Sequence, residues 1–377
     1  MRTFGIVAPR IALAAWAACL AIAGDAQTSD SAQRVFNENF SESDHFRAEQ
    51  AKELDGYIRM LAGDKSRLRA IFTPDYSSPK AFVASANKLR KKFADAIGYP
   101  PPGSAGIEPS TFVQMGEDDF GVYFRAMIPI LPGVHAEGIY IVPKGIHGRV
   151  PLVVSMHGGG GSPEVALFHG RANYHDMVRG AVKRGYAVFA PQHLFNAPGF
   201  PGDIRNRTDD RLRLVGTSLT AVEIAKITRS LDVLVKRPEV DSKRIAMVGL
   251  SYGGYYALVV PALEPRIKVA VSSCYFGVQE YRYALDELGV PSDFRFMDRF
   301  SLLRDSEIGA LICPRPLLIQ AGKTDDGPHR DMGIRLAPEV ADYYQRLGKG
   351  DSFQFLVFDG GHEFDDRSAW DFLGRFL

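Results

Sequence analysis

The chain has 377 residues, with 45 Lys and Arg against 44 Asp and Glu, and its sequence pI is close to 7.7. This balance argues against a nucleic-acid-binding protein, which usually carries a basic excess or a basic stripe. Hydrophobic residues make up 46% and charged residues 24%, which is typical of a globular protein and excludes a disordered chain. The length allows one large α/β domain with an additional element.

Residues 1–26 have the pattern of a cleavable export signal. Arg2 and Arg10 precede an apolar run over 11–23, and a small residue, Ala26, stands at the expected cleavage position. The apolar run is too short to span a bilayer comfortably. We therefore expect cleavage after Ala26, a secreted or periplasmic mature protein and no stable membrane insertion. The alternative is a buried N-terminal helix.

Two segments precede the predicted strands. Residues 27–98 are polar, with apolar residues at three- and four-residue spacings that predict two or three amphipathic helices. These apolar positions include Phe46, Leu54, Ile58, Leu61, Leu68 and Ile71. Residues 99–111 are rich in Pro and Gly, which cannot continue a helix, and are predicted to be a linker.

Residues 112–377 predict a single α/β domain. An antiparallel start over 122–130 and 138–142 is followed by strands that alternate with helices. The later strands are expected at 150–156, 186–190, 244–249, 267–273, 316–320 and 353–358. Repeated strand–helix–strand units require a mostly parallel sheet with helices on both faces. An aromatic-rich insertion over 275–311 is either a cap over the site or additional core packing.

The most informative segment reads Gly249-Leu250-Ser251-Tyr252-Gly253 and matches the pattern Gly-x-Ser-x-Gly. A buried-strand pattern precedes it and a helical pattern follows it, which is the context of a nucleophile on a strained strand-to-helix turn. Glycine is needed there because a side chain would clash where the backbone reverses. The segment predicts that Ser251 is a nucleophile. The alternative is an ordinary glycine-rich turn with a capping serine.

A serine nucleophile needs a base, and the base needs an orienting acid. In the fold that has this kind of strand-to-helix turn, the acid and then the histidine come after the serine along the chain. His362 lies in the loop after the last predicted strand and is the preferred base; its alternative is a surface-loop histidine. Asp325 follows the preceding strand and is the preferred acid. Asp326 remains an alternative acid, because neighbouring side chains on a turn point in different directions. We expect Glu363 to face solvent.

The reaction also needs hydrogen-bond donors for a developing oxyanion. A run of four glycines follows His157 at the end of a predicted strand, and the N–H groups of Gly158 and Gly159 are the expected donors there. The N–H of Tyr252 is the expected second donor. The alternatives are a flexible loop or a phosphate cradle, although Ser162-Pro163 follows the glycines where a Walker loop would need Lys-Ser/Thr.

No His-Glu-x-x-His or Cys-x-x-Cys motif occurs, and no Gly-x-Gly-x-x-Gly follows a strand. Neither a metal nor a dinucleotide is therefore indicated, and we expect no cofactor. Removal of residues 1–26 would leave Cys274 and Cys313. Their predicted places at opposite edges of the sheet exceed the roughly 7 Å Cα limit for a disulfide, so we expect none.

Together, Ser251, Asp325, His362 and the glycine run resemble the α/β-hydrolase superfamily. The stretch from Leu231-Asp232 through Arg237-Pro238-Glu239-Val240-Asp241 to Gly249–Gly254 is similar to exported dienelactone-hydrolase-like and acetyl-xylan-esterase-like members, and to the catalytic domain of prolyl oligopeptidases. The resemblance implies an eight-stranded, mostly parallel sheet and a metal-free serine mechanism. Dienelactone hydrolases proper have a Cys nucleophile where this chain has Ser251.

These observations predict an exported serine esterase that acts on small-molecule esters, with acylated carbohydrates as one class. A serine peptidase or amidase on the same fold is the second hypothesis. A non-catalytic hydrolase-fold binding module is the third, and it comes from a different functional class.

Overall fold

The computed structural model describes residues 35–103, 108–169, 172–194, 202–284, 292–325 and 329–377. The predicted signal at 1–26 and the alternative acid Asp326 lie outside these ranges. The chain divides into two compact units, 1–58 and 59–377. No helix in the described ranges has the length and apolarity to span a membrane.

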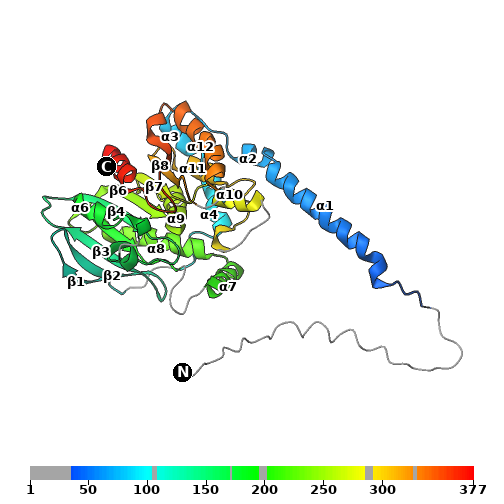
Figure 1. The fold of residues 1–377 in the computed structure, drawn as a ribbon, viewed down its shortest axis with the longest axis horizontal. Helices are drawn as coiled ribbons and strands as arrows, with labels where there is room; N and C mark the ends of the chain where they lie inside the picture. The colour runs from blue at the N-terminus through cyan, green and yellow to red at the C-terminus, as the bar shows by residue number, and fades with distance from the viewer. Residues whose placement is uncertain (1–34, 104–107, 170–171, 195–201, 285–291, 326–328) are drawn as a thin grey trace, which may run out of the picture. The chain divides into compact units, whose positions relative to one another are not determined.

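A nine-stranded sheet forms the centre of the second unit (Figure 1). Its order is β1-β2-β3-β5-β4-β6-β7-β8-β9. The strands are β1 (Thr111–Glu117), β2 (Gly121–Leu131), β3 (Val134–Pro143), β4 (Val150–Met156), β5 (Ala187–Pro191), β6 (Val240–Leu250), β7 (Val269–Ser273), β8 (Leu317–Gly322) and β9 (Phe353–Phe358). The β1–β2, β2–β3 and β3–β5 pairs are antiparallel, whereas the pairs from β5 to β9 are parallel.

The mostly parallel sheet is confirmed, but the expected count of eight strands is one too few. The additional strand, β1, lies at the edge of the sheet, and nearly all its side chains are exposed. An edge strand of this kind lacks the apolar run that marks a strand covered on both faces.

Helices cover both faces of the sheet. Successive strand residues point to opposite sides, so a strand of apolar residues needs a helical layer on each side. On one face, Val153 packs with α5 (Pro163–Leu167), α6 (Arg179–Lys183) and α13 (Asp366–Phe376). On the other, Leu152 and Val154 belong to the core of α8 and α9. That core contains residues of α3 (Pro79–Ser85), α4 (Asn87–Ile97), α8 (Leu219–Leu234), α9 (Tyr252–Leu263), α11 (Asp305–Ile312) and α12 (His329–Arg346).

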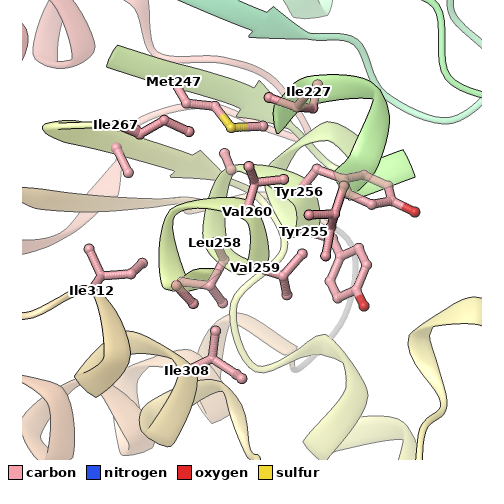
Figure 2. Packing of buried hydrophobic residues seen from close by; sticks show 14 of the residues in the cluster. Ile227, Met247, Tyr255, Tyr256, Leu258, Val259, Val260, Ile267, Ile308 and Ile312 are labelled. Atoms are coloured by element: carbon pink, nitrogen blue, oxygen red, sulfur yellow. The ribbon is translucent and has the colours of Figure 1, made fainter. Parts of the chain in front are cut away.

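Helix α9 is buried along its whole circumference. Its residues from Tyr252 to Ala262 are all buried. Figure 2 shows Met247 of β6 on one side of this helix and Ile308 of α11 on another. A helix that is apolar all round needs neighbours on every side, so α9 holds a fixed position behind the strand that precedes it.

The N-terminal helices differ in how much they bury. Within residues 35–63, the 3₁₀ turn η1 (Phe40–Ser43) and α1 (Asp44–Gly63) bury no side chain. The expected apolar positions Phe46 and Leu54 are both 62% exposed. The helix α2 (Ser66–Ile71) is also unburied, whereas α3 and α4 contribute Phe82, Leu89, Phe93 and Ile97 to the main core.

Two arginines bind the C-terminal ends of buried helices, and the first of them, Arg90 of α4, connects the N-terminal part to the centre of the domain. The guanidinium of Arg90 donates to the carbonyl oxygens of Ala262 and Leu311, at 3.0 and 3.1 Å. Arg315 donates to the carbonyl of Glu264 at 3.1 Å and to that of Pro261. These oxygens belong to the C-terminal ends of α9 and α11, where carbonyls lack helical partners and a positive charge is favoured.

The insertion contains α10 (Val278–Ala284), η3 (Ser292–Phe294) and α11. Four of its aromatic rings, on Tyr275, Phe276, Phe294 and Phe296, are buried in the main core. These rings therefore pack inside the domain, and their faces are not open to a ligand. The remaining described elements are α7 (Gly202–Leu214), η2 (Ala172–Tyr174) and η4 (Gly350–Ser352).

Candidate active site

The predicted site residues lie at the carboxyl ends of the parallel strands. Gly158 follows β4, Ser251 follows β6, Asp325 follows β8 and His362 follows β9. Because parallel strands end at the same edge of a sheet, four segments far apart in the sequence meet there. In open α/β sheets this edge is where ligands bind.

Ser251 occupies a strained turn between β6 and α9. Its φ is +58° and its ψ is −115°, and its N–H donates to the Ser273 carbonyl at 2.8 Å. A Cβ at Gly249 would overlap the Gly253 carbonyl, and a Cβ at Gly253 would overlap the Met156 carbonyl. Both glycines are therefore required by close backbone packing, and the left-handed backbone at Ser251 is typical of a functional site.

The structure brings Asp325 and His362 together. The Nδ1 atom of His362 lies 2.9 Å from Oδ1 and 3.0 Å from Oδ2 of Asp325. The Asp325 carboxyl is buried, whereas the His362 side chain is 42% exposed. This geometry fixes the neutral tautomer with the proton on Nδ1, so that Nε2 carries the lone pair that accepts a proton.

Backbone contacts hold the Asp325 and His362 loops against each other. The Thr324 N–H donates to the Gly360 carbonyl at 2.8 Å, and the Thr324 hydroxyl donates to the same oxygen at 2.9 Å. A Cβ at Gly322 would overlap the Gly361 carbonyl. Gly322 thus allows an approach of the two loops that no residue with a side chain would permit.

The glycine loop after β4 is also fixed. Gly158 lies beside the nucleophile, since a Cβ placed on it would be 3.4 Å from the Ser251 Cβ. The N–H of Gly158 donates to the Tyr174 hydroxyl at 2.9 Å, so this expected oxyanion donor is already engaged. Gly159 is exposed and Tyr252 is buried.

Tyr174 is a site residue that sequence reasoning missed. It ends the three-residue turn η2 and is only 2% exposed. Neither a motif nor an apolar periodicity marks it. The only signal was its place between the glycine run and the next strand.

Glu363 is half-buried, with 27% of its side chain exposed, and it has a partner that the sequence did not predict. Its Oε2 lies 2.6 Å from Nε2 of His175, and its Oε1 accepts from the Gly361 N–H at 2.9 Å. The hydrogen bond from His175 lowers the pKa of the Glu363 carboxyl. The residue beside His362 therefore ties the His362 loop to the segment that contains Tyr174.

Two histidines stack beneath the glycine loop. The ring centroids of His157 and His193 are 3.7 Å apart, with an interplanar angle of 17°. The Nδ1 of His157 donates to the Gly158 carbonyl at 2.9 Å, and the Nε2 of His193 donates to the His157 carbonyl. Burial lowers the pKa of His157 to about 4 and that of His193 well below its ordinary value. Both rings are therefore neutral and fix the loop.

A buried ion pair anchors the residue next to the nucleophile. The Tyr252 hydroxyl donates to Oδ2 of Asp293 at 2.8 Å and accepts from Arg205. Arg205 and Asp293 form an ion pair whose side chains are 2% and 0% exposed. Sequence reasoning missed both residues, because α7 and η3 carry no motif.

One group of side chains offers three kinds of metal ligand. Among the described residues, the ligand atoms of Cys274, Asp325 and His362 all lie within 4.8 Å of one another. Burial, with the nearby Asp325 charge, raises the pKa of the Cys274 thiol to about 12. An ion there would have to displace the hydrogen bond between Asp325 and His362, so the group does not fit a resident metal. Cys274 and Cys313 are unbridged buried thiols, as expected.

A strained serine at a strand-to-helix turn, followed along the chain by an acid and a histidine at the same sheet edge, defines an α/β-hydrolase. The chain belongs to the dienelactone hydrolase family, whose family model matches residues 138–327.

Among curated proteins, the chain is similar to YtaP of Bacillus subtilis (strain 168), which is named as a hydrolase. The two are 28% identical over 250 residues, which cover 60% of this chain and 78% of YtaP. The other curated relatives are longer, and the match covers between 26% and 32% of their length.

Two solved structures show the same fold. The methylesterase BT1017 superposes with a TM-score of 0.64 at 18% identity, over 84% of this chain and 67% of that one. The acetyl xylan esterase from Paenibacillus sp. R4 superposes with a TM-score of 0.52 at 20% identity, over 83% of this chain and 100% of that one.

Proposed function

We propose that the protein is an exported serine hydrolase that cleaves carboxylic esters through an acyl-enzyme. The observation that carries the proposal is the hydrogen-bonded pair of Asp325 and His362 at the sheet edge where Ser251 occupies its strained turn. In the α/β-hydrolase arrangement, these three positions form a nucleophile, a base and an orienting acid.

In the first half of the reaction, the Ser251 oxygen attacks the acyl carbonyl while Nε2 of His362 takes the hydroxyl proton. The tetrahedral intermediate collapses as His362 returns this proton to the leaving alcohol, which breaks the ester C–O bond. Water then attacks the acyl-enzyme by the same route, and the products are a carboxylic acid and regenerated Ser251. Asp325 keeps the imidazole in its orientation and stabilises its charged form.

The oxyanion formed in both steps needs donors near Ser251. The proposed backbone donors are the N–H of Tyr252, at the start of α9, and the N–H of Gly159. Gly158 was also predicted as a donor, but its N–H is bound to the Tyr174 hydroxyl. The positive end of the α9 dipole lies at the same place and favours the negative charge.

Esters are preferred over amides because the methylesterase and the acetyl xylan esterase share the fold. Both names point to acyl or alkyl esters, and the second points to an acylated carbohydrate. We therefore propose small esters, including acylated sugars, as the substrate class. The proposal of export depends on the signal pattern in residues 1–26. N-terminal sequencing of the protein recovered from the periplasm or the medium should therefore begin at Gln27.

The test compares the wild type with Ser251→Ala on p-nitrophenyl acetate. We expect kcat to fall by about three orders of magnitude or more, and labelling by a fluorophosphonate probe to disappear. Ser352→Ala is a matched control, because Ser352 precedes β9 at the other edge of the sheet. Turnover that survives Ser251→Ala would contradict the mechanism. Equal turnover of a peptide panel would favour the amidase hypothesis, and absence of both labelling and turnover in the wild type would favour a binding module.

A further inference from the structure

A groove lies on the side of the domain away from the candidate active site. Its walls come from α3 and α4, from the C-terminal ends of α9 and α11, and from the residues just before β8. We call it the arginine groove, because Arg90 and Arg315 both line it. Helix α9 runs for 12 residues from Tyr252 to Leu263, or about 18 Å, so the nucleophile and the groove lie at opposite ends of this helix.

The arginine groove has the size of a small-molecule site. Its volume is about 610 Å³, within the range of about 300–1,000 Å³ that is usual for such sites. The walls are largely apolar and include Val83, Leu263 and Leu311. An inorganic ion would leave this apolar surface in water, whereas an aliphatic chain would cover it.

The charged side chains that line the arginine groove are all positive. They are Lys80, Arg90 and Arg315, and no Asp or Glu is among the described residues of its walls. None of the three has an ion-pair partner within the part of the chain that the structure describes. The carboxylate of Glu264 acts on Arg315, but Arg266 already binds both its oxygens, at 2.9 and 2.6 Å.

The helix ends balance only part of this charge. Arg90 and Arg315 donate to carbonyl oxygens at the C-terminal ends of α9 and α11. Each helix end carries roughly half a negative elementary charge, which gives about one negative charge against the three positive side chains. The groove therefore keeps a positive potential that favours an anion.

The guanidinium groups also keep protons for a ligand. Arg90 donates to the carbonyls of Ala262 and Leu311 and to Oδ1 of Asn87, which uses three of the five N–H protons of a guanidinium. Burial, together with the nearby charge of Arg90, lowers the pKa of the Arg315 guanidinium to about 10. Both arginines are thus charged at neutral pH, and a carboxylate that accepts from them would offset their mutual repulsion.

We infer that the arginine groove binds an organic monocarboxylate with an aliphatic chain. Arg90 and Arg315 hold the carboxylate, Lys80 adds charge at the more exposed side, and Val83, Leu263 and Leu311 contact the chain. Binding is non-covalent, and it does not depend on the serine mechanism proposed above. Because the ligand contacts both α3–α4 and the end of α9, its binding stabilises the folded protein by mass action.

The test titrates octanoate into the wild-type protein by isothermal titration calorimetry. The matched ligands 1-octanol and octylammonium keep the chain but lack the negative charge. We expect one octanoate to bind per chain, octanol to bind about tenfold or more weakly because charge-assisted hydrogen bonds are lost, and octylammonium not to bind. Hexanoate should bind more weakly, by up to about fourfold for each methylene removed.

Variants of the groove place the ligand. Val83→Asp adds a carboxylate to the wall, and the fold should tolerate it because Val83 is 38% exposed; we expect octanoate affinity to fall by about tenfold or more through like-charge repulsion. Lys80→Gln removes an exposed charge and should weaken binding by about two- to fivefold.

Lys88→Gln is the matched control, because Lys88 is an exposed lysine of α4 that does not line the groove. Its octanoate affinity should stay within about twofold of the wild type. All three variants should hydrolyse p-nitrophenyl acetate as the wild type does, which separates the arginine groove from the candidate active site. Their melting temperatures without ligand check that each variant is folded.

Four outcomes would overturn the proposal. They are the absence of saturable octanoate binding, octanol binding as tight as that of octanoate, octanoate binding that Val83→Asp leaves unchanged, and a dimer in solution that Val83→Asp dissociates. The third would place the ligand elsewhere, and the fourth would assign the groove to a second copy of the chain. If Ser251→Ala remained active while octanoate bound as expected, the proposed function would fail and this inference would stand.

Discussion

Both carboxylate oxygens of Asp325 lie within hydrogen-bond distance of one atom of His362, its Nδ1, at 2.9 and 3.0 Å. The contact joins two loops that are 37 residues apart in the sequence. Asp325 is buried while the imidazole reaches solvent, so the carboxylate determines the orientation of a ring that is otherwise open to a substrate.

Asp325→Asn should preserve the packing but remove the acceptor that selects the His362 tautomer. We expect kcat on p-nitrophenyl acetate to fall by roughly 10³–10⁴-fold, with the melting temperature little changed. Asp359→Asn is the control, because its side chain is 91% exposed. If Asp325→Asn were as active as this control, Asp325 would not be the orienting acid.

Gly253→Ala should destabilise the protein. The new methyl group would overlap the Met156 carbonyl, and overpacking of this kind costs about 1–3 kcal/mol or more. Gly374→Ala is the control, since no atom lies within 4 Å of the new methyl group in α13 and alanine favours a helix by up to about 1 kcal/mol. Urea unfolding of both variants measures the difference, and equal stability would contradict the close packing at Ser251.

The buried His193 ring should make the protein sensitive to acid. Burial holds its folded-state pKa well below the ordinary value, so below about pH 6.5 the unfolded chain binds a proton that the folded chain does not. The stability from this neutral ring is fully present above that pH and is lost as the pH falls.

Comparison of the wild type with His193→Gln isolates the effect. The stability advantage of the wild type should shrink between pH 7 and pH 5, with a limiting slope of about 1.4 kcal/mol per pH unit. Urea unfolding at several pH values measures it. A difference that does not change with pH would show that His193 is not held neutral.

The Cys274 thiol should make the enzyme sensitive to thiophilic metal ions, although chelators should leave it active. Cadmium that binds Cys274 together with the adjacent Nδ1 and carboxylate would break the pair of His362 and Asp325. We expect EDTA to have no effect and Cd²⁺ to inhibit reversibly.

Cys274→Ala should remain active and resist Cd²⁺. Cys313→Ala should remain as sensitive as the wild type, because Cys313 precedes β8 at the opposite edge of the sheet. Equal sensitivity of the two variants would place the inhibitory site elsewhere.

The parallel strands were predictable because their apolar runs are long and are followed by helical patterns. The edge strand β1 was not, since it buries almost nothing.

The residues of the candidate site also divide into those that the sequence predicted and those that it did not. Ser251 and His362 follow from local patterns that a strained turn and a strand end require. For the acid, the sequence favoured Asp325 but left Asp326 as an alternative, because the direction of a side chain on a turn depends on the opposing loop. Tyr174, Arg205 and Asp293 were missed for a related reason: each acts through a tertiary contact with no local signature.

The arginine contacts at the ends of α9 and α11 bear on how short a folded version of this chain can be. Removal of everything before residue 99 would delete Arg90 and uncover the apolar surface on which Phe93 and Ile97 now rest. Such a truncated protein would lose support at the far end of the helix that begins at the nucleophile. A minimal expression fragment should therefore start before α3, even though every proposed reactive group lies well beyond it.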